Sequence, residues 1–419
     1  MENNTLAEYD NMTIAGLSLK AGRNFTSLDQ MRCWLGSGLH VKRLHPAWDR
    51  AEGNPYDESD SRTFQQRYGP SNLFTDLVFF LMTDQVAGAG ALMGVNESNA
   101  ANTLLDEEQF VTTSKFLRKQ QLFFNGVIVE RTNLRQFVTD TAPYFLCNFI
   151  IADGKFSLVP AVPHTGGGSI NTGTVQIDQL FTSGNILEDT FKVEYLRSEE
   201  RRPFKAVMRY RQETRNKLPQ EKVIEVKLPG KPERYGMDEL PEEQFDLTQF
   251  CTSESHARKV GMYFLGIRQF VTHTISFSTT VEGLSLKAGS YIKVLTSSSP
   301  YFSANNGTVD ASGVITSAQT LKDGTHTIAY FKTGSEDIEE GEISVSQGTT
   351  TQSQFFDSVF SVIKESNSEN IYIVEQLTFS QEGTVDIVAS EHQCDDEDGK
   401  PVSKLAKLIA TVDEEVEDD

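Results

Sequence analysis

Cysteine is scarce in this sequence, and its spacing excludes the common metal-binding motifs. No two of the four cysteines form a Cys-x-x-Cys pair, and none joins histidines at zinc-binding spacing. We therefore expect reduced thiols that are mostly buried as small apolar side chains. The four residues are Cys33, Cys147, Cys251 and Cys394.

Long apolar runs are absent as well. Residues 1–11 contain neither a basic region nor an apolar core, so they do not resemble a signal peptide. No run approaches the roughly 18 apolar residues that a membrane-spanning helix requires. We expect a protein that is made in the cytoplasm and has no membrane span.

Positive charge is in short supply, because 38 lysines and arginines face 59 aspartates and glutamates, for a formal net charge of −21. Binding to a phosphate backbone derives its affinity from basic side chains, so this balance argues against nucleic-acid binding as the main function. Two interpretations of the acidity remain open. One is a conduit through which DNA passes without sticking, and the other is solubility alone.

Helical patterns begin near residue 70. Apolar residues recur at helical spacing from Leu73 to Leu81. Asp106 with Gln109 forms a capping-box start for a second helix, and Thr132 opens a third. The three expected helices cover residues 71–83, 106–119 and 132–143.

Two dipeptides predict tight turns between strands. Asn-Gly and Asp-Gly tolerate the positive φ angles that two-residue hairpin loops require. The first turn would be Asn125-Gly126 within residues 122–130, and the second Asp153-Gly154 between residues 145–151 and 155–159.

Glycine and proline concentrate in residues 160–173, which we interpret as the clearest domain boundary. After it, alternating residues predict short strands. One helix interrupts them; Thr252 or Ser253 caps it, and its apolar stripe runs to Ile267 despite two interior glycines. The predicted fold class is α+β, mainly antiparallel β. The expected parts are 1–65, an N-terminal β segment; 66–165, a small α+β domain; 166–290, a β domain with one helix; 291–390, a small β-barrel domain; and 391–419, an acidic, disordered tail.

A candidate ligand-binding loop is the glycine triplet Gly166–Gly168 beside His164. It lacks the lysine and the Ser/Thr that a phosphate-binding loop places after its glycines, so a flexible linker is the favoured interpretation. Four histidines lie in separate contexts without a partnered Asp, Cys or Ser at motif spacing. We therefore predict no catalytic, cofactor-binding or metal-binding residue, and no enzyme activity. The four are His164, His256, His273 and His326.

Residues 197–235 form an island of positive charge, with twelve lysines and arginines against six glutamates. A nucleic-acid patch is one interpretation. The alternation of these charges with strand-forming residues favours a solvated strand face or a contact with an acidic neighbour. The heptapeptide GLSLKAG occurs at 16–22 and again at 283–289 with unlike flanks, so we interpret it as a shared strand-turn device or a coincidence.

Three stretches, in the same order and at similar spacing, resemble the central hub region of the host-specificity, or tip-attachment, proteins of phages with long non-contractile tails. The first runs from a strand segment into a helix that ends in an Ala-Gly-rich turn. The second has the order aromatic, Asn-Gly, helix, hairpin and proline. The third has pieces that contain FKVEYL, SHARKVGMYFLG and NIYIVEQLTF. They are residues 14–41 with 70–90, residues 123–163, and residues 191–204 with 255–294 and 370–392.

The resemblance implies a baseplate-hub-like subunit with tail-tube-like β domains, to which residues 1–65 and 166–290 would contribute. It implies a structural virion protein at the tail tip, which closes the distal end of the tail tube and connects it to the host-recognition apparatus during DNA delivery. The expected partners are two further copies in a homotrimer, the distal tail protein ring, the tape-measure protein and other tail-tip or fibre proteins. No sequence-specific nucleic-acid binding is expected.

Two departures from the family pattern shape this hypothesis. Relatives have a further tube-like portion before the first stretch, so the strands expected over 8–45 need a partner, and an open edge there is an aggregation hazard unless another chain covers it. We therefore expect a hub divided between gene products, with a separately encoded N-terminal half. Relatives also often continue into receptor-binding segments, whereas this sequence ends in an acidic stretch.

Two other functions are weighed against the hub. A receptor- or glycan-binding tail adhesin would present exposed aromatic platforms, whereas Trp34 and Trp48 both lie among the first sixty residues. A tail-associated hydrolase would need a carboxylate pair or metal ligands in one cleft.

Overall fold

The structure of the chain is a computed structural model, and its described residues lie between 40 and 417. All of its described residues belong to one compact unit, residues 39–419. Trp34, Trp48 and the first copy of GLSLKAG lie outside them, as do the strands expected before residue 40. The described residues are 40–44, 68–96, 99–100, 104–128, 133–152, 154–197, 199–213, 219–228, 240–296, 306–317, 321, 323–335, 337–362, 369–379, 383–397 and 400–417.

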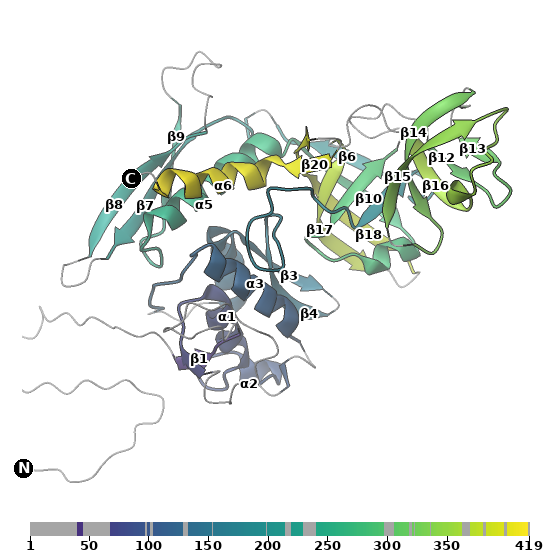
Figure 1. Cartoon of the computed structure of the whole chain (residues 1–419). Helices are drawn as coiled ribbons and strands as arrows, with labels where there is room; N and C mark the ends of the chain where they lie inside the picture. The colour runs from purple at the N-terminus through teal and green to yellow at the C-terminus, as the bar shows by residue number, and fades with distance from the viewer. Residues whose placement is uncertain are drawn as a thin grey trace, which may run out of the picture. The chain divides into compact units, whose positions relative to one another are not determined.

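The fold is α+β with mainly antiparallel strands, as the sequence predicts (Figure 1). In its first part, helices pack around a core rich in phenylalanine. The Phe74 ring stacks on Phe145 with centroids 4.6 Å apart, and Phe79 meets Phe110 edge-on. The elements of this part are β1, His40–Lys42, paired with β2, Tyr68–Pro70; α1, Phe74–Thr83; α2, Gly90–Met93; α3, Glu107–Lys119; α4, Leu134–Thr141; and the 3-10 turn Ala142–Phe145.

The helix starts follow their capping residues. Asp106 accepts a hydrogen bond from the Gln109 backbone at 3.1 Å, which confirms the predicted cap of α3. Asn133 caps α4 in the same way, through the Gln136 backbone at 3.2 Å. Thr132, the expected start, lies outside the described residues.

The two predicted turns have different outcomes. The second predicted hairpin is confirmed, because β3, Cys147–Ala152, pairs with β4, Lys155–Pro160, and Gly154 has φ +73°, while Asp153 lies outside the described residues. The Asn125-Gly126 hairpin is wrong for the described residues 122–128, whose backbone pairs with other segments. Asn125 donates to the Phe250 carbonyl at 2.8 Å, and a Cβ on Gly126 would lie 2.3 Å from the Gln249 carbonyl oxygen. This glycine permits a close approach instead of a hairpin turn.

A six-stranded sheet joins segments from both sides of residue 290. Its order is β5-β11-β17-β18-β10-β6, and every neighbouring pair is antiparallel except β5 with β11. Alternate residues of β10 are buried, which is the alternation that the sequence predicts there. The strands are β5, Gln179–Thr182; β6, Lys192–Tyr195; β10, His273–Thr279; β11, Tyr291–Leu295; β17, Ile371–Phe379; and β18, Val385–Glu391.

A five-stranded antiparallel sheet is inserted between β11 and β17, in the order β13-β12-β16-β14-β15. The strands of residues 291–390 are therefore divided between two sheets, since the first and last of them complete the six-stranded sheet. The inserted strands are β12, Asn306–Val309; β13, Ile315–Ser317; β14, Gly324–Lys332; β15, Ile338–Val345; and β16, Ser358–Val362.

Helix α5, Glu254–Phe270, packs on a three-stranded sheet and on α6 (Figure 1). Its two interior glycines allow both contacts. A Cβ on Gly261 would lie 3.0 Å from Val226 of the sheet, and one on Gly266 would lie 2.5 Å from Leu405 of α6. The sheet has the order β8-β7-β9, with β7, Lys205–Gln212; β8, Gln220–Val226; and β9, Glu242–Asp246.

The C-terminal segment differs from the expected disordered tail. β19, Cys394–Glu397, pairs with β20, Lys400–Ser403, and α6, Lys404–Glu417, follows at once. The helix buries Ile409 and Val412 in the core that α5 shares. The acidic strand is neutralised locally, since Asp395 pairs with Lys404 and Lys407.

Candidate functional site

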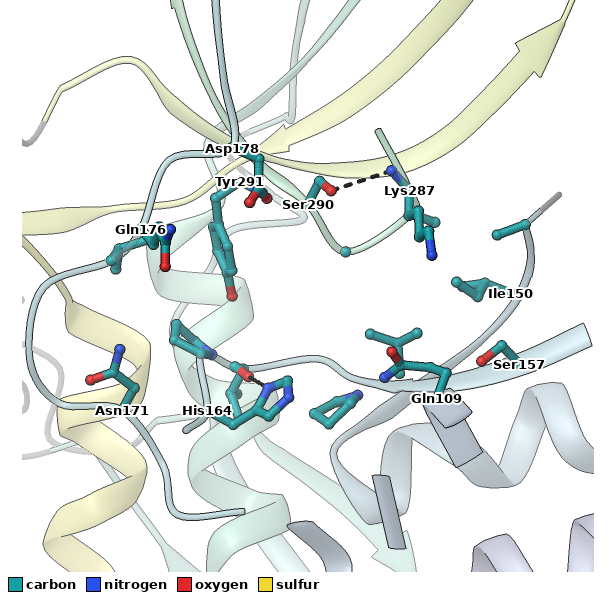
Figure 2. A pocket seen from close by; sticks show the side chains of 18 of the residues that line it. Gln109, Ile150, Ser157, His164, Asn171, Gln176, Asp178, Lys287, Ser290 and Tyr291 are labelled. Carbon is teal, nitrogen blue, oxygen red and sulfur yellow. Dashed lines mark hydrogen bonds between the residues drawn. The ribbon is translucent and has the colours of Figure 1, made fainter. Parts of the chain in front are cut away.

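A cleft of about 330 Å³ brings together polar side chains from several segments of the described chain. Its walls come from α3, the β3–β4 hairpin, residues 162–178 and the loop that leads into β11. Figure 2 shows the side chains that line it. The residues that matter below are Gln109, Ser157, His164, Asp178, Lys287 and Tyr291.

One wall is fixed by reciprocal bonds between Asp178 and Tyr291. The Asp178 backbone donates to the Tyr291 carbonyl at 2.8 Å, and the Tyr291 backbone donates to the Asp178 carboxylate at 2.9 Å. Burial, reinforced by nearby acidic groups, raises the pKa of Tyr291, so its phenol keeps the proton at neutral pH. The Ser290 hydroxyl accepts a hydrogen bond from the Lys287 backbone at 3.3 Å.

The second copy of GLSLKAG ends in this wall. Gly289 has φ +94°, and a Cβ there would lie 3.0 Å from Val159 of the opposite wall. Lys287, also from the repeat, extends its side chain into the cleft (Figure 2). The described residues offer it no ion-pair partner.

The opposite wall carries His164, Gln109 and Ser157. The His164 Nδ1 lies 3.3 Å from the Val162 carbonyl oxygen, and burial lowers the pKa of His164, so the ring is neutral at pH 7. Ser157 is 1% exposed, and its hydroxyl has no hydrogen-bond partner among the described residues. A buried hydroxyl without a partner costs free energy.

Two common catalytic arrangements are absent from the described part of this cleft. Within the described ranges no hydrogen bond joins Ser157 to His164, so no activated nucleophile is formed. Nor do three or more His, Cys, Asp or Glu side chains of the described part gather at metal-binding geometry.

The other three histidines do not reach this cleft. His256, on α5, lies 2.8 Å from the Tyr144 carbonyl oxygen, and burial lowers its pKa to about 4. His326 lies on β14 opposite Ile343. His273 is on β10, in the six-stranded sheet.

His273 belongs to a buried polar cluster that sequence reasoning missed. Its Nδ1 lies 3.3 Å from the Glu391 carboxylate and its Nε2 lies 3.1 Å from the Tyr372 hydroxyl, while Thr272 donates to Glu391 as well. Burial alone would raise the pKa of Glu391, but the hydrogen bonds from His273 and Thr272 outweigh it and hold that pKa below its ordinary value. Thr272 and Glu391 are 119 residues apart, so no spacing motif signals this cluster.

The glycine triplet is held in place at one of its ends. Gly168 has φ +85°, and its carbonyl accepts a hydrogen bond from the Gln120 side chain at 3.2 Å. The buried Lys259 of α5 donates to the backbone and side-chain oxygens of Gln120, both at 3.2 Å. The segment expected as a flexible linker therefore packs against the end of α3 and, through Gln120, is tied to α5.

Within the described residues, part of the basic island lies on β7 and β8 of the three-stranded sheet, where glutamates accompany the positive charges. Lys205 pairs with Glu225 and Glu242, and Arg209 pairs with Glu221. These ion pairs agree with a solvated strand face. They also leave fewer unpaired basic side chains to bind the phosphate backbone of a nucleic acid.

No helix in the described ranges is long and apolar enough to cross a membrane. No protein-family model matches the chain, and no curated protein matches it either.

Solved structures give distant matches. One is the virion of a native gene transfer agent particle, at 9% identity and TM-score 0.34, over 68% of this chain and 46% of that one. A tail protein from Neisseria meningitidis MC58 has 9% identity and TM-score 0.30, over 64% and 58% of the two chains. The 43 kDa tail protein of prophage MuSo2 from Shewanella oneidensis has 6% identity and TM-score 0.25, over 63% and 54%. This chain thus spans about half the length of each, and TM-scores this low do not establish a shared fold.

Proposed function

We propose that the chain is a structural, non-enzymatic subunit of a bacteriophage tail, located in the central tail-tip or baseplate hub. In this role it closes the distal end of the tail tube and connects the tube to the host-recognition apparatus during DNA delivery. The net charge of −21 suits a surface past which DNA moves without binding.

The observation that carries the proposal is where the hub-like sequence falls in the fold. The third stretch that resembles phage hub proteins consists of three pieces, 191–204, 255–294 and 370–392. These pieces supply β6, β10, β11, β17 and β18, which are five of the six strands of one sheet. Segments that are distant in sequence thus meet in one structural unit, and this supports the proposal.

The proposal includes a ring of three copies that contacts the distal tail ring, the tape-measure protein and other tail-tip or fibre proteins. It also includes a separately encoded N-terminal half of the hub. An available contact is β6, an edge of the six-stranded sheet in the described chain, on which Tyr195 is 63% exposed. Unpaired strand edges accept a strand or loop from a neighbouring subunit.

Electron cryomicroscopy of the phage particle that contains this chain tests the proposal. Three copies around the tail axis at the tip are expected, in contact with the end of the tube. Particles from a phage that lacks the gene serve as the control for assigning density. Location of the chain at the ends of the fibres would refute the hub role and favour an adhesin.

A further inference from the structure

We propose that the outer edge of β3 binds an extended strand from a different polypeptide. This goes beyond the structural role proposed above, because it names the surface and the chemistry of the partner. Three features carry the inference. They are backbone groups of β3 that point away from β4, a row of uncharged side chains on β3, and the charges on other strand edges of the described chain.

The direction of the backbone groups follows from the contacts of β4, the other strand of this hairpin (Figure 1). Phe156 of β4 donates to the Leu104 carbonyl at 2.7 Å, and the Phe156 carbonyl accepts from the Asp106 backbone at 3.1 Å. Both groups therefore point away from β3. It follows that Phe156 and its partner Ile151 form a pair without mutual hydrogen bonds, so the backbone groups of Ile151 also point outward, on the other edge of the hairpin.

Pairs of this kind alternate along an antiparallel hairpin, and Phe149 with Leu158 is the next one. On the β4 side, the Leu158 carbonyl accepts a hydrogen bond from the Thr113 hydroxyl at 2.5 Å. On the β3 side, the backbone N–H and C=O groups of Phe149 and Ile151 have no hydrogen-bond partner among the described residues. The edge of β4 is thus bonded to its own chain, and the edge of β3 is open to another strand.

The side chains of β3 are uncharged and partly exposed. Ile151 is 56% exposed, and Phe149, Ile150 and Ala152 are half-buried. Natural proteins protect exposed strand edges with charged residues or proline. Because β3 has neither, its edge suits a partner strand whose own side chains are apolar and uncharged.

The end strands of the larger sheets show the protection that β3 lacks. Pairing one of them, from a second copy, with β3 would remove charged side chains from water beside Phe149 and Ile151. The charged residues are Lys192 and Glu194 of β6; Glu221, Lys222 and Glu225 of β8; Glu242, Glu243 and Asp246 of β9; and Glu339, Glu340 and Glu342 of β15.

The uncharged strands of a second copy do not supply the partner either. An antiparallel contact between two β3 strands closes as a two-fold dimer, whereas the ring of three proposed above, on which this step rests, has no two-fold axis. β5 is buried along its whole length, and the Ile315 backbone of β13 already donates to the Gly348 carbonyl at 2.9 Å. The partner strand is therefore assigned to a different polypeptide.

Hydrogen exchange at residue resolution tests the contact, on the isolated full chain and on assembled particles that contain it. The Phe149 and Ile151 amides are expected to exchange about a hundredfold more slowly in the particle, because there they bond to the added strand. The Asn148 and Ile150 amides, which bond to β4 in both states, are the internal control and should keep their rates. Unchanged exchange at Phe149 and Ile151, or equal slowing of all four amides, would overturn the proposal.

Ile151→Pro removes the outward N–H and leaves the bonds to β4 in place, because proline is tolerated at a strand edge whose N–H faces solvent. Its incorporation into particles is expected to fall about tenfold through the lost hydrogen bond. Ile151→Val, the matched control, keeps the N–H and an apolar side chain and should assemble normally. If Ile151→Pro does not fold, Ile151→Lys replaces it, since a charge on this edge should also lower incorporation. Normal incorporation of a folded Ile151→Pro, or of Ile151→Lys, would overturn the proposal.

A photo-reactive amino acid in place of Asn148, an exposed residue of β3, identifies the source of the strand in the particle. A cross-link to a different polypeptide, together with slowed exchange at Phe149 and Ile151, supports the proposal. A cross-link to a second copy, or to another segment of this chain, would overturn it. The hub role is tested separately by the location of the chain, so slowed exchange in a chain at the fibre ends would refute the hub and still confirm the strand contact.

Discussion

At the scale of single residues, the glycine triplet divides into one constrained residue and two unconstrained ones. A Cβ on Gly168 would lie 2.6 Å from the backbone of Lys115, and φ there is +85°. A Cβ on Gly167 would meet nothing closer than 3.8 Å. In the sequence, Gly167 and Gly168 are both glycines of one loop. Only the contact of Gly168 with α3 in the folded chain distinguishes the two.

Gly168→Ala is therefore expected to lower the free energy of unfolding by about 2–4 kcal/mol, from the left-handed backbone and the clash together. Gly167→Ala, the matched control, should change it by less than about 0.5 kcal/mol. Urea unfolding followed by circular dichroism measures both. Equal midpoints for the two variants would contradict the packed role of the triplet.

Asp76 makes the stability of the first part dependent on pH. The side chain is 1% exposed and accepts hydrogen bonds from Ser71 at 2.6 Å and from the Leu44 backbone at 3.2 Å. Burial raises the pKa of its carboxyl from 3.8 to about 6, although these hydrogen bonds act in the opposite direction. The folded chain thus holds this proton more tightly than the unfolded chain does. The stability from this group is fully present below pH 3.8 and is lost as the pH rises through about 6.

Asp76→Asn keeps the shape of the side chain and removes the titration. The stability of the variant relative to the unchanged chain should therefore rise between pH 4 and pH 7, by up to about 3 kcal/mol. Thermal unfolding at a series of pH values measures this difference. Glu188→Gln, which alters an exposed carboxylate, is the control and should show no such window. A flat difference for Asp76→Asn would show that the carboxyl is not desolvated.

At the scale of elements, a structure decided by neighbouring residues can be predicted from the sequence, and one decided by tertiary contacts cannot. The Asp106 cap and the β3–β4 hairpin are decided by neighbours in sequence, so both could be predicted. The Asn125-Gly126 dipeptide carries the same turn signal, but the Asn125 backbone donates to the Phe250 carbonyl, and the neighbouring Phe124 backbone donates to the Asn72 carbonyl. A dipeptide does not reveal that a distant segment competes for those groups.

Helix α6 was missed because its acidic end outweighed its apolar spacing. Leu405, Ile409 and Val412 recur at helical intervals, and all three are buried.

Ile409→Ala is expected to destabilise the chain by about 2–4 kcal/mol through the cavity left beside α5. Thr411→Ala on the same helix, which removes only a local hydrogen bond to the Leu408 carbonyl, should cost less than about 1 kcal/mol. Thermal melting of both variants tests this prediction. Equal melting temperatures would indicate that the C-terminal segment does not pack on α5.

At the scale of the whole molecule, the fold class follows from composition and alternation, but the partners of the strands do not. β10 pairs with β18 although more than one hundred residues separate them, and the five-stranded sheet lies between β11 and β17 in sequence. Alternation shows which residues face a core without showing which strand lies beside which. For the same reason the cleft was not anticipated, since Ser157 and Lys287 come from segments that meet only in the folded chain.

The proposed ring makes a prediction about the isolated protein. Sedimentation of the purified chain is expected to show trimers, or a shift to trimers on addition of the proposed N-terminal partner, because closed symmetry satisfies exposed strand edges. Sedimentation should be measured at more than one salt concentration. At low salt, the net charge of −21 makes the subunits repel one another most strongly. A monomer at every protein concentration, with and without the partner, would contradict the ring.

The position of the five-stranded sheet has a consequence for the evolution of the chain. Its segment leaves the six-stranded sheet after β11 and returns at β17, and these two strands are direct neighbours, with Lys293 opposite Ile371. Whatever lies between them can be lengthened, shortened or exchanged without altering any pairing in the parent sheet. This junction is therefore a position at which a change in the length of the chain leaves the order of the six-stranded sheet unchanged.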